Sequence, residues 1–377
     1  MKHHKLVIRA VIFIAAFLCF TISNAQEYNN WLLNGGGILN FNTFPATLIC
    51  KKDENIVKNT IALSDDNGQI ILYGYKVKSD QRLSDFVIKN SENEVIVSFY
   101  CTEVRNVIGC KLPQGGYYIA VVYRQHLFTS ELHIYKFDIN GKLENEFIYS
   151  DGIYTPFMTF IQEDNYEILF VYNSKYETIE KYKLTSDEVF KTEQYELKLE
   201  MFSMREIVTF NIITSLDNSK IIACTYGAVS VLNYDKTTGL ISLADKFETT
   251  KFYAIAFSET DKYFLIIDDN TLKGFRFNGT FDFDTEKPDI SYKLTEETIS
   301  NTLWNMCLGN DGKIYIHNIS SDCIMVIDGI EAGNMTSEII QSECVKNCLN
   351  LFPQIPRLQK IQSTPCPEIE KPKIICE

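Results

Sequence analysis

One pattern occurs three times in the stretch from Ile212 to Asp328. Each copy has a short apolar strand, a polar turn centred on an aspartate, a second apolar strand, another turn and a third strand. The turn aspartates, Asp217, Asp261 and Asp311, are spaced by 44 and 50 residues. A repeat of this length built only from strands is typical of a β-propeller blade, which is a small antiparallel sheet. The sequence therefore predicts an all-β protein.

Weaker copies of the pattern fill the preceding part of the chain. Six turn positions are equivalent, and they predict six blades. A seventh blade would form if the N-terminal strand region, Trp31–Phe41, joined strands near the C-terminus and closed the ring. We therefore expect a single β-propeller over residues 26–350, with seven blades favoured and six or eight left open. The equivalent turn positions are Asn67, Gly115, Asp164, Asp217, Asp261 and Asp311.

Two segments fit the repeat less clearly. Tyr195–Met204 has both helical and strand character, and its alternating apolar residues favour an outer strand followed by a loop. Helix should be sparse in this fold, and Ser337–Asn347 is the best candidate for a short one. The turn aspartates recur because tight turns favour aspartate, so we assign them to the scaffold.

The first 25 residues have the pattern of a secretory signal peptide. A basic start, Met1–Arg9, precedes the apolar run Ala10–Ile22, and Ser23–Ala25 is a small-residue cleavage site. This run is too short to remain as a membrane span. No later segment is long and apolar enough to span a membrane. We therefore expect an exported protein in the periplasm, on the outer-membrane surface or outside the cell.

The chain is acidic, with a formal net charge of −13 at pH 7. An acidic surface repels nucleic-acid phosphates and anionic lipid, so neither is an expected partner. The simplest role of this charge is to keep an exported protein soluble.

Ten cysteines follow the signal peptide, an even number that suits disulfides in an oxidising compartment. The first candidate pair flanks a predicted turn at Arg105-Asn106 and would meet across a hairpin. The last pair lies within the Pro-rich tail, residues 351–377, in which strands are disfavoured. The middle pair would bond to each other or to the tail. In chain order the candidates are Cys101, Cys110, Cys344, Cys348, Cys366 and Cys376.

Reactive groups with recognisable spacing are scarce. No G-x-S-x-G nucleophile elbow and no cysteine–histidine zinc pattern occurs, so we predict no catalytic or cofactor-binding residue. His133 lies in an alternating strand pattern, which favours a structural role. Asp282, Asp284 and Glu286 concentrate hard oxygen ligands and are weak candidates for Ca²⁺. The run around them lacks the glycine of a calcium loop, and solvated loop charges are the favoured interpretation.

Four motifs resemble those of one protein family. They are an Asn-Trp, Gly-rich, Leu-x-Phe-Asn opening, an Asp-x-x-Gly turn before an apolar strand, a strand-Asp-x-x-Thr-Gly and Phe-Ser pair, and a late Asp-Gly-Lys-Ile-Tyr element. Together they resemble the WD40/YVTN-like propeller region of large surface proteins from gliding bacteria with type IX secretion. Here Val57–Thr60 replaces an acidic Glu-Gly element of that family, and the C-terminal adhesion and sorting domains do not follow. The matching residues are Asn30, Trp31, Gly35, Gly37, Leu39, Phe41, Asn42, Asp65, Gly68, Leu72, Tyr73, Asp235, Thr238, Gly239, Phe257, Ser258, Lys262, Asp311, Gly312, Lys313, Ile314 and Tyr315.

This resemblance implies a secreted or cell-surface propeller. The leading functional hypothesis is a non-enzymatic module that binds an envelope or surface protein, or a polysaccharide, within a secretion, gliding or adhesion assembly. The alternative is a hydrolase or lyase acting on a glycan or lactone, with carboxylates or a metal in the central channel. Several carboxylates or histidines on the inner strands would favour the alternative.

Overall fold

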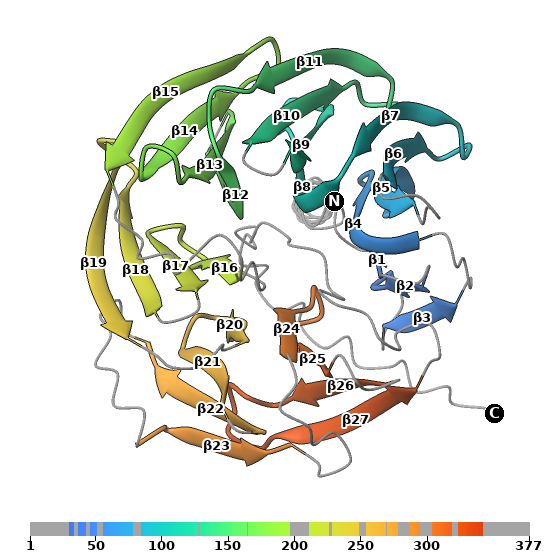
Figure 1. The fold of residues 1–377 in the computed structure, drawn as a ribbon. Helices are drawn as coiled ribbons and strands as arrows, with labels where there is room; N and C mark the ends of the chain where they lie inside the picture. Colours follow the sequence, from blue (N-terminus) through green and yellow to red (C-terminus); the bar gives the residue numbers. More distant parts are fainter. Residues whose placement is uncertain are drawn as a thin grey trace, which may run out of the picture.

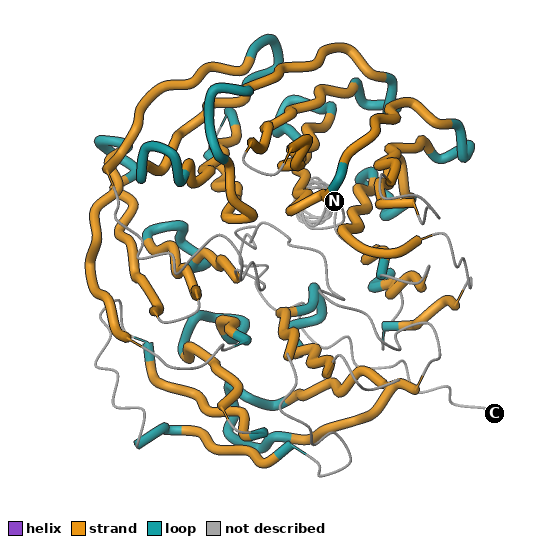
Figure 2. Tube along the Cα trace, viewed as in Figure 1, coloured by secondary structure: helices purple, strands orange, loops and turns teal. Residues whose placement is uncertain are grey.

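The structure is a computed structural model in which the described residues form a ring of seven small sheets (Figure 1). This confirms the predicted seven-bladed β-propeller. No helix occurs in the described residues, which Figure 2 shows as strands and loops, and none of their segments could cross a membrane as a long apolar helix. The described residues are 30–33, 37–42, 46–50, 56–77, 84–126, 129–163, 165–196, 211–225, 228–248, 254–268, 270–277, 287–294, 304–318 and 323–341.

Each blade is an antiparallel sheet whose strands follow one another from the inside of the ring to the rim (Figure 1). Blade 1 has three strands and the other six have four. Blade 1 is β1 (Asn30–Leu32), β2 (Gly37–Asn40) and β3 (Thr47–Cys50); blade 2 is β4 (Ile56–Ser64), β5 (Ile70–Val77), β6 (Ser84–Asn90) and β7 (Val95–Cys101); blade 3 is β8 (Glu103–Lys111), β9 (Tyr117–His126), β10 (Thr129–Phe137) and β11 (Leu143–Tyr149). Blade 4 is β12 (Tyr154–Gln162), β13 (Glu167–Asn173), β14 (Thr178–Leu184) and β15 (Val189–Glu196); blade 5 is β16 (Asn211–Thr214), β17 (Lys220–Thr225), β18 (Ala228–Asp235) and β19 (Leu240–Glu248); blade 6 is β20 (Ile255–Phe257), β21 (Tyr263–Asp268), β22 (Thr271–Arg276) and β23 (Ile290–Lys293); blade 7 is β24 (Trp304–Leu308), β25 (Ile314–Asn318), β26 (Cys323–Asp328) and β27 (Thr336–Gln341).

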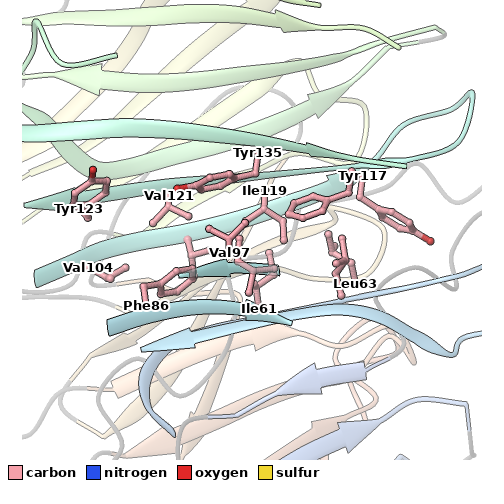
Figure 3. Close-up of a cluster of buried hydrophobic side chains, with 14 of the residues drawn as sticks. Ile61, Leu63, Phe86, Val97, Val104, Tyr117, Ile119, Val121, Tyr123 and Tyr135 are labelled. Atoms are coloured by element: carbon pink, nitrogen blue, oxygen red, sulfur yellow. The ribbon is translucent and has the colours of Figure 1, made fainter. Parts of the chain in front are cut away.

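The core lies between neighbouring blades, and the period of two in each strand builds it. In β9, Ile119 and Val121 pack with Ile61 of blade 2 (Figure 3). The intervening Ala120 and Val122 pack toward blade 4. Successive side chains of a strand point to opposite faces of the sheet, so a middle strand of a propeller is buried on both sides. This explains why the strand reads as a continuous apolar run.

The turn aspartates belong to the scaffold, as the sequence predicted. The Asp65 carboxylate accepts hydrogen bonds from the backbone N–H groups of Asn67 and Gln69, at 2.9 and 2.8 Å. Gly68 follows with φ of 73°, a left-handed conformation that glycine adopts at low cost. Asp261 also accepts a hydrogen bond from the backbone N–H of Leu216, in the corresponding turn of the preceding blade. These turns therefore stabilise single hairpins and tie neighbouring blades together.

Blade 1 closes the ring in a different way from the one predicted. Its three strands pair with one another, and none of them pairs with a described strand of blade 7. Closure between the described residues comes from packing, since the Trp31 ring centroid lies 5.5 Å from that of Tyr315 in blade 7. On the other side, Asn30 Nδ2 donates hydrogen bonds to Ser64 Oγ and the Gly68 carbonyl of blade 2, at 3.0 and 2.7 Å.

Two other segments test the sequence analysis. The predicted helix at Ser337–Asn347 is wrong over its described part, because Thr336–Gln341 forms β27 and pairs with β26. Pairing with β26 completes the fourth strand of blade 7, and this long-range gain overrides local helical character. The outer strand predicted at Tyr195 is confirmed as far as Glu196, where the described part of β15 ends.

The hairpin predicted between Cys101 and Cys110 is also wrong. Strand β8 continues through Arg105-Asn106 without a turn. Cys101 packs between blades 2 and 3, whereas Cys110 packs between blades 3 and 4, so the sheet of blade 3 separates the two thiols. Burial raises the pKa of the Cys101 thiol to about 11. The other four cysteine candidates, the signal peptide and the tail lie outside the described residues.

Candidate functional site

Three consecutive inner strands are irregular near their first residues. The register shifts between Lys58 and Ile61 in β4, between Val104 and Asn106 in β8, and between Tyr154 and Met158 in β12. These positions lie at one face of the ring, opposite the turn aspartates, and we call it the bulged face. Bulges insert extra residues into one strand and re-aim side chains, and they are common beside functional sites. The bulged face is therefore the first place to look for a site.

Arg105 is the extra residue of the bulge in β8. Val104 pairs with Tyr123 and Asn106 pairs with Val122, so Arg105 has no partner on β9. The bulge releases its side chain from the alternation that buries the rest of the strand. The guanidinium reaches the inner strand of the next blade, where Nη1 donates a hydrogen bond of 3.4 Å to the Tyr154 carbonyl. This distance is long for such a bond, so the contact is weak.

The charge of Arg105 is poorly compensated by its described neighbours. Its Nε is buried and has no acceptor among the residues described. Burial lowers the pKa of Arg105, the nearby Glu103 opposes this shift, and the positive charge of Arg124 adds to it. The Glu103 carboxylate accepts a hydrogen bond from Arg124 Nη1 at 3.3 Å. The site therefore contains two guanidinium groups and one carboxylate, and Arg105 Nε is a donor without an acceptor among the described residues.

Tyr154 connects this site to a second polar group inside blade 4. Its hydroxyl lies 3.3 Å from Glu180 Oε2 and 3.4 Å from the Tyr182 hydroxyl. Glu180 is fully buried and also accepts hydrogen bonds from Tyr182 at 2.5 Å and Asn173 at 2.8 Å, and it pairs with Lys191 at 2.9 Å. Burial is the main cause that raises the pKa values of Tyr154 and Tyr182. These saturated contacts indicate a structural group that holds Tyr154 in place.

His133 has the structural role that the sequence predicted. Its two ring nitrogens lie 3.1 Å from Glu131 and 3.0 Å from Glu146, and the hydroxyls of Tyr123 and Tyr135 lie 2.8 and 3.1 Å away. The side chain is buried on blade 3 with both nitrogens engaged. It therefore has no ring nitrogen to offer to a metal.

The sequence predicts a turn at Arg105-Asn106 and does not identify Arg105 as a site residue. A signal was present, because a charged residue interrupts the apolar alternation between Val104 and Val107. The weak Ca²⁺ candidates, Asp282, Asp284 and Glu286, lie outside the described residues. Within the described ranges, no three His, Cys, Asp or Glu side chains are grouped so that they could hold a metal.

No protein-family model matches this sequence, and no curated protein matches it either. Several solved structures are similar in fold. A functionally unknown protein from Desulfotomaculum acetoxidans is 14% identical, with a TM-score of 0.52 over 85% of this chain and 95% of that one. A putative 6-phosphogluconolactonase from Bacteroides fragilis is 10% identical, with a TM-score of 0.53 over 85% and 98%. The periplasmic gluconolactonase PpgL from Pseudomonas aeruginosa is 12% identical, with a TM-score of 0.51 over 87% and 99%.

These likenesses extend over nearly the whole of each neighbour and establish the shared propeller fold. At such low identity they show the fold alone, because one fold hosts many unrelated functions. The function has to be argued from the site itself.

Proposed function

We propose that this protein is an exported β-propeller that acts as a non-enzymatic binding module for an envelope protein or a glycan. It works in the periplasm, on the outer-membrane surface or outside the cell. The resemblance to surface proteins of gliding bacteria supports a place in a secretion, gliding or adhesion assembly. The propeller supplies a rigid scaffold, and the bulged face presents the recognition groups.

The observation that supports this proposal is the bulge at Arg105. It places a half-buried guanidinium with an unused donor across the inner strands of two blades. Charged donors that find no acceptor inside a protein are costly, and a ligand that supplies the acceptor removes this cost. The site is thus suited to holding an anionic group.

The alternative is a hydrolase or lyase acting on a glycan or lactone. Acid–base chemistry on a sugar uses two carboxylates at a defined separation. Glu103 is the one carboxylate in the described parts of the inner strands, and it already accepts a hydrogen bond from Arg124. The bulged face thus offers donors for binding more readily than an acid–base pair, which supports the binding proposal.

The experiment has two parts. Cell fractionation should recover the protein, without its first 25 residues, in the envelope or the medium. The mature chain, immobilised through its C-terminus, should then retain one protein or glycan from envelope extracts, and Arg105→Glu should reduce this retention. An exposed charge on blade 6 provides the control, Arg276→Glu, which should retain the ligand fully. A cytoplasmic protein, or equal retention by both variants, would contradict the proposal.

A further inference from the structure

The strongest feature outside the scaffold is the combination of Arg105 with the neighbouring connection Ser150–Ile153 and the hairpin tip Ser174–Glu177. We propose, building on the binding function above, that this part of the bulged face recognises a carboxylate-bearing sugar, a uronate residue of a glycan. Arg105 binds the carboxylate, and Tyr176 supports the sugar ring.

The shape of the guanidinium selects the anion. Nη1 of Arg105 is directed to the Tyr154 carbonyl, which leaves the edge formed by Nε and Nη2. That edge is a planar fork, and it matches the two oxygens of a carboxylate in a bidentate pair. Because the single bond of 3.4 Å holds the guanidinium weakly, a small rotation brings the fork to an incoming ligand.

Arg105 is not the only hydrogen-bond donor to the Tyr154 carbonyl. It accepts a second, shorter hydrogen bond of 2.6 Å from Ser130 Oγ. When Arg105 turns to a ligand, this acceptor therefore stays satisfied. Binding exchanges one weak neutral acceptor for a charged one, which forms stronger hydrogen bonds with a guanidinium.

The aromatic contact comes from the hairpin between β13 and β14. Tyr176 is 46% exposed. Its hydroxyl donates to the Asp151 carbonyl at 3.3 Å, and Lys175 Nζ donates to the same carbonyl at 2.7 Å. Asp151 precedes Tyr154 by three residues, so the held ring and Arg105 flank the same short segment. Lys175 Nζ also lies over this ring, 4.7 Å from its centroid. A fixed, partly exposed aromatic ring that carries a cation suits the apolar face and the acid group of a uronate.

Because the whole molecule carries a net negative charge, binding of an anionic ligand depends on direct contacts at the site and not on long-range attraction. At −13, the protein repels an extended polyanion at long range. Affinity must then come from the few groups at the site, and a short oligosaccharide is the appropriate probe.

The test is calorimetric titration of the mature chain with three probes: trigalacturonate, the neutral trisaccharide maltotriose, and triglutamate. The first should bind about tenfold more tightly than either of the others. Triglutamate carries side-chain carboxylates without a sugar ring, so equal or tighter binding of triglutamate would overturn the glycan assignment. Equal binding of maltotriose would overturn the role of the carboxylate.

Variants assign the contact to its residues. Arg105→Gln and Arg105→Lys should each lower trigalacturonate affinity about tenfold, since lysine lacks the planar fork. Tyr176→Ala should also lower it, and Arg276→Gln should leave it unchanged. Arg105→Gln should melt no lower than the wild type, because it removes a buried donor that has no described acceptor. Unchanged binding by folded Arg105→Gln would overturn the proposal, whereas Arg105-dependent retention of an envelope protein would leave the general binding function standing.

Discussion

Glu180 shows what a single buried charge demands of its surroundings. It is fully enclosed in blade 4 and is contacted by Tyr154, Tyr182, Asn173 and Lys191. Its environment thus supplies a donor for each direction in which the carboxylate can accept. Arg105 is the opposite case, because a charged side chain retains a donor with no acceptor among the described residues. The contrast separates a residue that holds the fold together from one that is available to a ligand.

Removing the Glu180 carboxylate should be costly. Glu180→Ala leaves the Lys191 ammonium and several buried donors without their acceptor, and breaking a buried pair in this way typically costs about 3–5 kcal/mol. Urea denaturation of the mature chain measures the change in the free energy of unfolding. Glu193→Ala on the neighbouring strand is the control, since its carboxylate is 44% exposed and pairs with Lys181 at 3.5 Å. We expect the control to lose less than about 1 kcal/mol. Equal losses in the two variants would contradict the structural role of Glu180.

At the scale of elements, the close approach of strands β4 and β8 explains why residue 109 is a glycine. The sequence pattern alone does not explain this glycine. A Cβ on Gly109 of β8 would lie 2.6 Å from Ile61 Cδ1 and 2.9 Å from Leu63 Cδ1 of β4. Both contacts are with terminal methyl groups, which can move only at the expense of the packing between blades 2 and 3. The absence of a side chain at this position therefore sets how closely the two blades pack.

Gly109→Val should consequently destabilise the protein by about 1–3 kcal/mol through overpacking, although valine favours strands. Thermal and urea unfolding would detect this loss. Ser98→Val on the outer strand β7 introduces the same side chain at an exposed position and should change stability by less than about 0.5 kcal/mol. A neutral or stabilising Gly109→Val would show that β4 and β8 are farther apart than the structure places them.

The elements that sequence analysis predicted are those fixed by local chemistry. Turn aspartates such as Asp217 and Asp311 accept backbone hydrogen bonds within their own hairpins, so their spacing revealed the blades. The bulge at Arg105 depends on pairing with a strand that begins twelve residues later, and it was mistaken for a turn. The closure of blade 1 depends on contacts with residues far away in the sequence, such as Tyr315. These long-range contacts cannot be obtained from a local pattern.

At the scale of the whole molecule, buried tyrosines are distributed around the ring, and they link its stability to alkaline pH. Burial raises their pKa values above the ordinary 10.0. Below pH 10 the phenols are neutral in both states. Above pH 10 the unfolded chain releases these protons while the folded ring retains them, so the free energy of unfolding falls as pH rises. The residues concerned are Tyr118, Tyr135, Tyr154, Tyr182, Tyr234 and Tyr315.

We therefore expect these phenols to ionise together with unfolding above pH 10. Phenolate absorbance and far-ultraviolet circular dichroism, recorded on the same samples, should show coincident transitions for this group. Tyr182→Phe removes one such phenol and should weaken the fall in stability with pH. Ionisation of all six while the circular dichroism stays native would contradict the burial seen around the ring.

The closure of the ring is a property of the whole molecule. Blade 1 is the smallest sheet, and Trp31 fixes it in place: the indole is fully buried, 4.7 Å from Phe41 and 5.5 Å from Tyr315 between ring centroids. Because an open ring would expose the faces of blades 2 and 7, loss of this contact should affect the stability of every blade.

Trp31→Ala should cost about 3–5 kcal/mol. It should also broaden the single unfolding transition, as the ends of the ring separate before the other blades unfold. Ile49→Ala, at an exposed position on β3 of the same blade, should leave both the midpoint and the sharpness of unfolding nearly unchanged. A sharp transition with a small loss in Trp31→Ala would mean that the ring is closed mainly by contacts other than this aromatic cluster.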